Sequence, residues 1–263
     1  MKKLAILIII CTSFVCIQCQ KEEQKLNLHV PSPDWEDQVI YFLMLDRFAD
    51  GDTTNNNQNG GEFDQKNFRK FSGGDIQGVI DHLDYIQSLG ATAIWITPPV
   101  ANQWWDPEIQ FSGYHGYWAE NFKEVDKHFG DLELYQQLSH EIHERGMYLI
   151  QDIVLNHTGN FFNYEGGYNK GDVSQYYKLN ENSTPVSKPT QYPFNLNDPK
   201  DSIQRSANIY NWTPDISNYD DPEQKLTYQM AGLDDINTTN IVVRDVLRDS
   251  YGYWVNVVGV DSR

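Results

Sequence analysis

Cysteine is nearly absent from this 263-residue sequence: its three cysteines, Cys11, Cys16 and Cys19, all lie among the first 19 residues. The part of the chain that folds after this segment is therefore expected to contain no disulfide bonds. No apolar run reaches the roughly 20 residues that a membrane-spanning helix needs. Basic residues are also scarce, since 20 Lys and Arg face 37 Asp and Glu and give a formal net charge of −17. A surface of this charge repels phosphate groups, so we do not expect nucleic acid as a partner.

The first residues have the pattern of an export signal. Lys2 and Lys3 precede an apolar run from Leu4 to Ile17, and charged residues follow soon after it. This order of a basic start, a short apolar run and a polar end is typical of a signal peptide. We expect residues 1–19 to be the signal and residues 20–34, which are polar and contain two prolines, to be a tether to the folded part.

Cys19 stands where the apolar run meets the charged residues, and this junction resembles the lipobox of bacterial lipoproteins. In those proteins the cysteine is lipidated after cleavage, although Gln18 here occupies a position where a small residue is usual. The sequence thus predicts a lipoprotein of a bacterial cell envelope or surface, held at the membrane by its lipid alone. The alternative is an ordinary cleaved signal and a secreted protein.

Strand and helix patterns alternate from about residue 35 onward. The continuous apolar run Val39–Leu45 predicts a strand covered on both faces, and further strands are predicted at Thr92–Thr97 and Met147–Leu155. Apolar residues at helical spacing predict a helix over residues 76–89 and a second over 134–142, each closed by a glycine a few residues later. Strands and helices in this order imply a parallel sheet, in either an open doubly wound fold or a barrel.

The positions of unusual polar residues favour the barrel. These residues stand at the carboxyl ends of the predicted strands, where both folds carry their active sites: Asp46, Arg47, Thr97, Asn156 and His157. No glycine-rich phosphate loop of the GxGxxG or GxxxxGK[ST] type follows the first strand. This absence removes the commonest reason for an open nucleotide-binding sheet.

The later sequence divides into two parts. Residues 158–233 lose their periodicity, and their many aromatic side chains argue for a small packed subdomain rather than a disordered loop. Residues 234–263 begin with a helical pattern that has its N-cap at Thr238 or Thr239 and runs to about Val258. The predicted apolar face of this helix consists of Val242, Val243, Val246 and Leu247.

Two segments resemble motifs of glycoside hydrolase family 13, the α-amylase family, whose catalytic domain is a (β/α)8 barrel. Asp152-Ile-Val-Leu-Asn156-His157 is similar to the motif on the family's third strand, and Gly113-Tyr-His-Gly-Tyr-Trp118 to the loop after its second strand. The resemblance implies an α/β fold of the TIM-barrel type. Residues 35–157 would form its first part, residues 158–233 a subdomain inserted after the third strand, and residues 234–263 the third helix and the start of the fourth strand.

The resemblance implies a sugar-binding role for the aromatic and histidine side chains of these segments. Tyr117 would stack under the sugar at the cleaved position, since an aromatic face offers apolar contact to ring C–H groups. His157 would hydrogen-bond that sugar, His115 would support the site, and Trp118 completes the candidate substrate-binding set. The structural alternatives are an aromatic loop that only packs and an Asn-His pair that satisfies itself at a strand end.

The resemblance also implies two calcium sites. Asn156 and Asp235 would share a structural calcium ion, with Asp234 standing where the family usually has proline. A second site resembles the extra calcium site of cyclodextrin glycosyltransferases, and its implied ligands are Asp50, Asp52, Asn55, Asn56, Asp75 and the carbonyl group of Gly73. Closely spaced carboxylates and amides supply the hard oxygens that Ca²⁺ prefers. The alternative for this run is a solvated turn rich in Asn and Asp.

Cleavage of a glycosidic bond with retention needs two carboxyl groups roughly 5 Å apart. In the family the nucleophile follows a Gly-x-Asp segment on the fourth strand, and Gly259-Val-Asp261 fits the start of that segment. The nucleophile and the acid would lie beyond Arg263. We therefore expect the N-terminal half of the barrel, truncated near its fourth strand and inactive on its own, with unpaired strand edges.

Three functions fit these patterns. The first is an exported, calcium-binding enzyme of carbohydrate metabolism that acts on an α-linked glucan such as starch, maltodextrin, pullulan or cyclodextrin. The second is a noncatalytic glucan-binding surface protein on the same fold, which keeps Tyr117 and His157 without cleavage. The third, a sugar-phosphate enzyme on another barrel, is disfavoured because no glycine-rich phosphate loop is present.

Overall fold

The computed structural model describes residues 29–180, 183 and 185–261 of the chain. The predicted signal at residues 1–19, with its cysteine at position 19, and most of the predicted tether lie outside the described residues. A short 3-10 helix, η1 (Trp35–Asp37), precedes the first strand.

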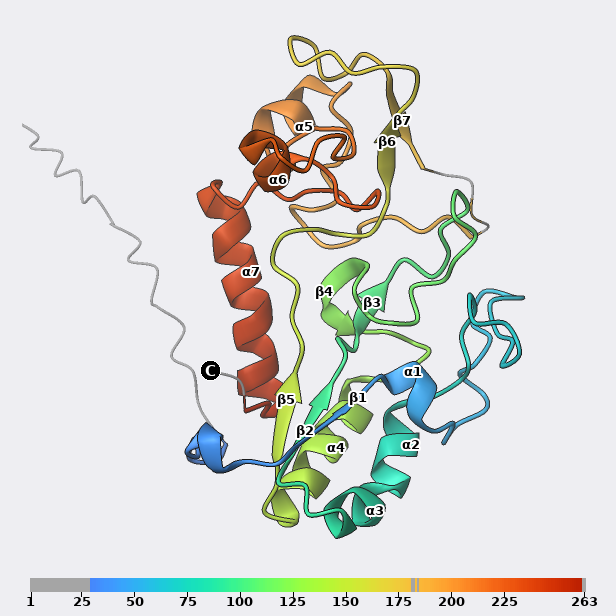
Figure 1. Cartoon of the computed structure of the whole chain (residues 1–263), viewed down its shortest axis with the longest axis vertical. Coiled ribbons are helices and arrows are strands. Elements are labelled where there is room, and N and C mark those ends of the chain that lie inside the picture. Colours follow the sequence, from blue (N-terminus) through green and yellow to red (C-terminus); the bar gives the residue numbers. More distant parts are fainter. Residues whose placement is uncertain (1–28, 181–182, 184, 262–263) are drawn as a thin grey trace, which may run out of the picture.

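Three parallel strands form the central sheet, as the sequence predicts (Figure 1). Strand β2 (Ala93–Ile96) lies between β1 (Ile40–Leu43) and β5 (Tyr148–Gln151), and the register brings the last residues of all three strands side by side. The polar residues that follow these strands in the sequence therefore start from one edge of the sheet.

The first predicted strand extends too far toward the C-terminus. Leu45–Phe48 form a single helical turn, α1, which begins as Arg47 N donates to the Met44 carbonyl oxygen at 3.0 Å. The buried Asp46 carboxylate accepts hydrogen bonds from the backbone N–H groups of Ser72 and Gly73. These bonds hold α1 against the loop that precedes the next helix. The first strand therefore ends at Leu43.

Helices α2 (Ile76–Asp81), α3 (Leu83–Ser88) and α4 (Leu132–Glu144) cover one face of the sheet (Figure 1). Asp75 caps α2 and Asp131 caps α4, each by accepting a hydrogen bond from a backbone N–H of the first turn. The core between sheet and helices is built from fully buried aliphatic side chains, among them Ile76, Leu83, Ile94, Ile96, Leu138, Ile142 and Leu149.

The helix predicted over residues 76–89 is divided at His82. Its Nδ1 atom lies 2.8 Å from the carbonyl oxygen of Gly78, the acceptor that the backbone N–H of His82 would use in a continuous α-helix. That N–H bonds instead to the Val79 carbonyl oxygen. The side chain thus competes with the backbone for one acceptor, and α2 and α3 form in place of one helix.

The other face of β1 and β2 is partly open. Ile40 and Phe42 are 45% and 51% exposed, and the Trp95 ring, 37% exposed, meets Phe42 nearly edge-on with 5.1 Å between centroids. The prediction that the first strand is covered on both faces is therefore wrong for the described part of the chain. Side chains alternate along a strand, so only every second one faces the helices.

An antiparallel hairpin that the sequence did not predict follows β2. Strands β3 (Val100–Asn102) and β4 (Ala119–Val125) pair with shifts in register, and the loop between them carries the Gly113–Trp118 segment. Gly116 has a φ of 87°, and a Cβ atom there would lie 2.1 Å from the Pro98 carbonyl oxygen. Only glycine fits this close approach, which folds the loop back toward the carboxyl edge of the sheet.

Residues 158–180, 183 and 185–240 form a packed region above the sheet (Figure 1). It contains the hairpin β6 (Phe162–Tyr164) and β7 (Tyr177–Leu179) and the short helices α5 (Ser202–Ala207) and α6 (Pro222–Thr227). The prediction that aromatic side chains pack here is confirmed for the buried residues Phe161, Phe162, Tyr177 and Trp212. It is wrong for Tyr176 and Tyr219, which are exposed.

The last long helix, α7 (Ile241–Tyr253), continues as a π-helical segment, η2 (Trp254–Val258), and ends where the sequence predicts. The predicted N-cap at Thr238 or Thr239 is wrong, because Asn240 caps the helix by accepting a hydrogen bond from Val242 N. Of the predicted apolar face, Val243 and Leu247 are buried, Val246 is half-buried, and Val242 is exposed. No helix within residues 29–180 and 185–261 is long and apolar enough to cross a membrane.

Two contacts fix this C-terminal part to strand β5 and to the segment that follows it. The Tyr251 hydroxyl donates to the Val154 carbonyl oxygen at 2.6 Å and accepts from Val154 N at 3.0 Å. After η2, Asp261 N donates to the Leu149 carbonyl oxygen at 2.8 Å, while the Asp261 carboxylate accepts from Leu149 N and contacts His143 Nε2. The chain therefore runs beside β5 where the fourth strand is predicted to start.

Candidate functional site

Tyr117 lies at the centre of the candidate site, held on three sides. Its hydroxyl donates to Asp152 Oδ2 at 2.7 Å, and its backbone N–H donates to His115 Nδ1 at 3.0 Å. Its ring lies nearly parallel to that of His115, with an angle of 24° and 5.6 Å between centroids. The phenol is thus fixed in one orientation, because Asp152 at the end of β5 and the loop before β4 both hold it.

Both histidines of the site are half-buried, and both have a lowered pKa that keeps them neutral near pH 7. Burial, with a smaller effect from the nearby His157 and Arg47, lowers the pKa of His115 to about 4. Burial also lowers the pKa of His157, although the Tyr117 carbonyl oxygen, 3.1 Å from His157 Nε2, acts in the opposite direction. A carbonyl oxygen only accepts, so Nε2 carries the proton and Nδ1 of His157 is left as an acceptor.

Trp118 belongs to the wall behind the site. Its side chain is 8% exposed and meets the His115 ring edge to face at 4.7 Å between centroids. Its backbone N–H donates to the Asn102 side-chain oxygen at 2.6 Å. The structure therefore places Trp118 beside His115 rather than at the surface, and it brings Asn102, which the sequence did not single out, into the support of this loop.

Arg47 connects the site to the first strand. Its guanidinium lies 3.7 Å from the centroid of the Tyr114 ring and forms an ion pair of 3.1 Å with Asp46. Burial raises the pKa of Asp46 to about 6, although the Ser72 backbone N–H and Arg47 oppose the rise. A cation over an aromatic face and a buried carboxylate together fix the position of the Gly113–Trp118 loop.

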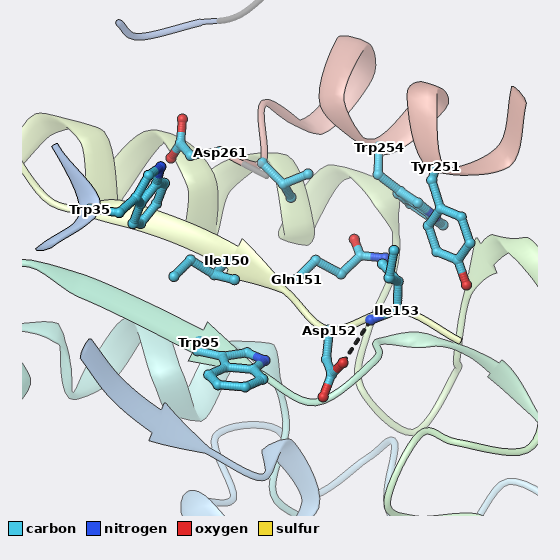
Figure 2. A pocket seen from close by; sticks show the side chains of 10 residues that line it. Trp35, Trp95, Ile150, Gln151, Asp152, Ile153, Tyr251, Trp254 and Asp261 are labelled. Atoms are coloured by element: carbon cyan, nitrogen blue, oxygen red, sulfur yellow. Dashed lines mark hydrogen bonds between the residues drawn. The ribbon is translucent and has the colours of Figure 1, made fainter. Parts of the chain in front are cut away.

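A cavity of about 330 Å³ opens beside Asp152 (Figure 2). Three tryptophans contribute to its walls, namely Trp35, Trp95 and Trp254. Asp152 points to one end of the cavity, where Oδ1 accepts a hydrogen bond from Ile153 N at 2.8 Å. The same carboxylate therefore takes part in both the cavity and the Tyr117 contact.

The loop that carries the second set of predicted calcium ligands is compact. Asp75 is fully buried and accepts from the backbone N–H groups of Gly51, Asp52 and Gly78 and from the Asn55 side chain. Asn56 Nδ2 donates to Asp50 Oδ2 at 2.8 Å. These bonds hold five of the six predicted ligands in two sets, Asp75 with Asp52 and Asn55, and Asn56 with Asp50.

The sixth ligand, Gly73, lies against Asn56. A Cβ atom on Gly73 would stand 2.6 Å from Asn56 Oδ1, so the backbone and this amide oxygen are close neighbours. The Oδ1 atoms of Asn55 and Asn56 are buried and have no hydrogen-bond partner in the described part of the chain. Buried oxygens that lack donors are what a hard cation would satisfy, so these residues fit Ca²⁺.

The other predicted calcium pair is brought together only through its backbone. Ile236 N donates to the Asn156 carbonyl oxygen at 2.9 Å, and His157 and Asp235 form an antiparallel bridge. The Asn156 side chain is exposed, whereas the Asp235 carboxylate accepts from Asn211 Nδ2. Burial raises the pKa of Asp235 to about 6, an effect that the Asn211 contact partly offsets.

Carboxylates and histidines alone form no metal centre among the described residues. Among residues 29–180, 183 and 185–261, no group of three or more His, Cys, Asp or Glu side chains is placed to hold a metal ion. Any cation bound by the described residues must therefore also use amide or backbone oxygens. That donor set is characteristic of calcium rather than of zinc.

Comparison with known proteins gives the family. Residues 42–262 match the model of the alpha amylase catalytic domain. The chain is 33% identical over 232 residues to a cyclomaltodextrin glucanotransferase of Klebsiella oxytoca, and 35% identical over 229 residues to a beta/alpha-amylase of Paenibacillus polymyxa. Each alignment covers 87% of this chain but only 32% and 16% of the relatives, respectively, so the chain spans a third or less of their length.

Solved structures give the same result. An Anoxybacillus alpha-amylase superposes with a TM-score of 0.64 at 31% identity, covering 87% of this chain and 40% of the other. A cyclomaltodextrin glucanotransferase with a three-domain ABC distribution gives a TM-score of 0.67 at 28% identity, with coverage of 85% and 43%. The fold matches part of an α-amylase catalytic domain. The chain belongs to the α-amylase family of glycoside hydrolases.

Proposed function

We propose that this chain supplies the sugar-binding part of an enzyme that acts on α-linked glucans, and that Tyr117 is its platform. The observation that supports the proposal is the fixed Tyr117 ring, held by Asp152, His115 and His157. A sugar ring that lies on this phenol would gain apolar contact with its C–H groups and keep its hydroxyls available. The relatives are named a cyclomaltodextrin glucanotransferase and a beta/alpha-amylase, and both names fit this substrate class.

The described residues would bind and position the glucan. A neutral His157 can accept a hydrogen bond from a sugar hydroxyl at its Nδ1 atom. We assign Asp152 the role of positioning Tyr117 and not that of transferring a proton. Bond cleavage needs a nucleophile and an acid about 5 Å apart, and we assign neither role to a described residue. Stacking and hydrogen bonding instead set the position of the bond to be cleaved.

Calcium is part of the proposal. Asp50, Asp52, Asn55, Asn56, Asp75 and the Gly73 carbonyl would hold one ion, and Asn156 with Asp235 would contribute to a second. A bound Ca²⁺ supplies positive charge that offsets these carboxylates and links the loops that carry them. The unpartnered oxygens of Asn55 and Asn56 support the first of these sites.

We also propose export and lipidation at Cys19, on the basis of the sequence pattern alone. A mature protein that begins with a lipid-bearing cysteine would have a distinctive mass and would sediment with the membrane fraction. Replacement by Ser should release the protein from that fraction. Release of the unsubstituted protein into the medium would contradict the proposal.

The function is tested by titrating the chain with maltoheptaose and following the heat of binding. We expect saturable binding that Tyr117→Ala abolishes and that Tyr117→Phe weakens about five- to tenfold, because the phenyl face remains while its hydrogen bond to Asp152 is lost. Tyr219→Ala, at an exposed position in the same chain, is the matched control and should bind like the unsubstituted protein. Equal affinity of Tyr117→Ala and Tyr219→Ala would refute the proposed platform.

A separate measurement distinguishes an enzyme from a noncatalytic glucan-binding protein. Release of reducing sugar or of cyclic products from starch by the complete gene product would establish catalysis. Saturable glucan binding by that product without any turnover would instead support the binding protein.

A further inference from the structure

Two exposed apolar side chains are brought near each other beside the loop of the candidate site. Phe68 is 69% exposed and Ile109 is 50% exposed. Arg69 connects them, because its guanidinium carbon lies 5.6 Å from the Phe68 ring centroid and its Nη1 donates to the Ile109 carbonyl oxygen at 3.1 Å. We call Phe68 and Ile109 the Phe68 strip. A single exposed apolar residue needs no explanation, whereas a pair brought together from two segments can mark a binding surface.

The backbone at Phe68 is fixed by hydrogen bonds. Its carbonyl oxygen accepts from Arg47 Nη2 at 3.1 Å. The following carbonyl oxygen, that of Arg69, accepts from both N and Oγ of the fully buried Ser112, each at 2.9 Å. An exposed ring on a fixed backbone loses little freedom when it meets a ligand, so this ring is preorganised for contact.

The same bonds tie Phe68 to the loop that carries Tyr117. Arg47, which holds the Phe68 carbonyl oxygen, also lies over the Tyr114 ring with 3.7 Å to its centroid. Ser112 lies earlier in that same loop. The Phe68 strip and the proposed sugar platform are therefore held by one set of contacts, which keeps their relative positions fixed.

A series of aromatic rings runs from Phe68 toward Tyr117. Phe68 meets Phe111 nearly edge-on, with 6.2 Å between centroids and an angle of 66° between the ring planes. Phe111 lies 6.5 Å from the His115 ring, which in turn stacks on Tyr117 at 5.6 Å. Three ring contacts thus separate the exposed ring from the platform, a distance that several glucose units of one chain can span.

The size and chemistry of the strip favour a glucan over a protein as its occupant. A stable protein interface uses about 20–30 residues on each side, whereas the strip offers two apolar side chains. A glucose unit needs only one aromatic ring, because the C–H groups of the sugar contact the aromatic face and its hydroxyls stay in water. A glucan bound at Tyr117 would also lie close to the strip, since the two surfaces are continuous.

We propose that the Phe68 strip binds outer glucose units of the same α-glucan chain whose inner unit lies on Tyr117. The inference rests on the proposed function and extends it, because it gives the site a preference for long chains. A disaccharide on Tyr117 would end before the strip, whereas a heptasaccharide would reach Phe68 and gain its apolar contact. Phe68 would therefore determine specificity for chain length.

The test is calorimetric titration of the complete chain with maltose and with maltoheptaose. Phe68→Ala should lower the affinity for maltoheptaose about fivefold and leave the affinity for maltose unchanged. Phe68→Tyr keeps an aromatic ring and should retain the affinity for both sugars. An unchanged maltoheptaose affinity in Phe68→Ala would overturn the proposal and leave the strip to a protein neighbour. An equal loss for both sugars would also overturn it, since Phe68 would then act only through the position of Tyr117.

Two further variants separate this proposal from the proposed function. Tyr85→Ala removes another exposed aromatic side chain, 52% exposed on α3, and should bind both sugars like the unsubstituted chain. Tyr117→Ala should abolish the binding of both sugars. If Tyr117→Ala does so while Phe68→Ala changes neither affinity, the platform stands and the strip is refuted. If the unsubstituted chain binds neither sugar, both are refuted.

Discussion

The Tyr117 hydroxyl and the Asp152 carboxylate, 2.7 Å apart, connect the loop before β4 to the end of β5. Tyr117 is the residue that we propose to contact sugar, and Asp152 directly follows strand β5 of the sheet. Because the Tyr117 hydroxyl is bonded to Asp152, Tyr117 would contact a bound sugar through its ring and not through its oxygen.

We expect Asp152→Ala to reduce the affinity for maltoheptaose about five- to tenfold, because a hydrogen bond to a charged group is worth roughly 1.5–3 kcal/mol and part of it is regained from water. The reduction should vanish when the same change is made in Tyr117→Phe, where no hydroxyl is left to hold. Calorimetric titration of the double-mutant cycle measures the coupling. An equal effect in both backgrounds would mean that Asp152 contacts the sugar itself.

Stability should fall in acid as His115 takes up a proton. The pKa of His115 is lowered from 6.5 to about 4, so between these values the unfolded chain binds a proton that the folded chain does not. The free energy of unfolding therefore rises with pH across this window, by on the order of 3 kcal/mol in total. His115→Gln should flatten the dependence between pH 4 and 6.5 in urea unfolding, and an unchanged slope would count against a buried neutral ring.

His128 should have the opposite effect. Burial opposes its charge, but Asp126, 2.7 Å from Nδ1, and Glu62 outweigh burial and raise its pKa to about 9. The stabilisation is complete below pH 6.5 and is lost as the pH rises through 9. His128→Gln should therefore cost more stability at pH 6 than at pH 10, by on the order of 3 kcal/mol. Equal losses at both values would show that His128 acts through its packing on Phe71 alone.

Chelation of calcium should lower the melting temperature by several degrees. An ion present at a hundred times its dissociation constant stabilises the folded state by about 2.7 kcal/mol. Asp52→Asn should reduce this dependence, whereas Asp81→Asn, at an exposed position on nearby α2, should keep it. A melting curve that chelator does not move, measured by circular dichroism, would contradict calcium binding by the chain.

The parallel sheet and the long helices could be predicted because their apolar periodicity extends over many residues. The division at His82 depends on one side-chain bond to the Gly78 carbonyl, which no periodicity reports. The β3–β4 hairpin was missed because β3 has only three residues and β4 includes three charged ones. Short elements that rely on partners elsewhere leave little signal in the local sequence.

The candidate site could be predicted only in part, for a related reason. Tyr117, His115 and His157 stand in compact motifs, so a resemblance could locate them. The hydrogen bond from Asn160 to Asp106 spans 54 positions, and no spacing rule connects the two residues. The bond between Asp152 and Tyr117 likewise depends on how the end of β5 and the loop before β4 meet in space.

The Tyr251 contact with Val154 spans 97 positions and pins both ends of the region above the sheet. The entropy of closing a loop grows slowly with its length, and each doubling costs only about 0.6 kcal/mol. Insertions in the exposed loops between these two residues should therefore be tolerated, since a single hydrogen bond offsets such a change. Selection can remodel this region in length and composition while Tyr117 and Asp152 keep their places.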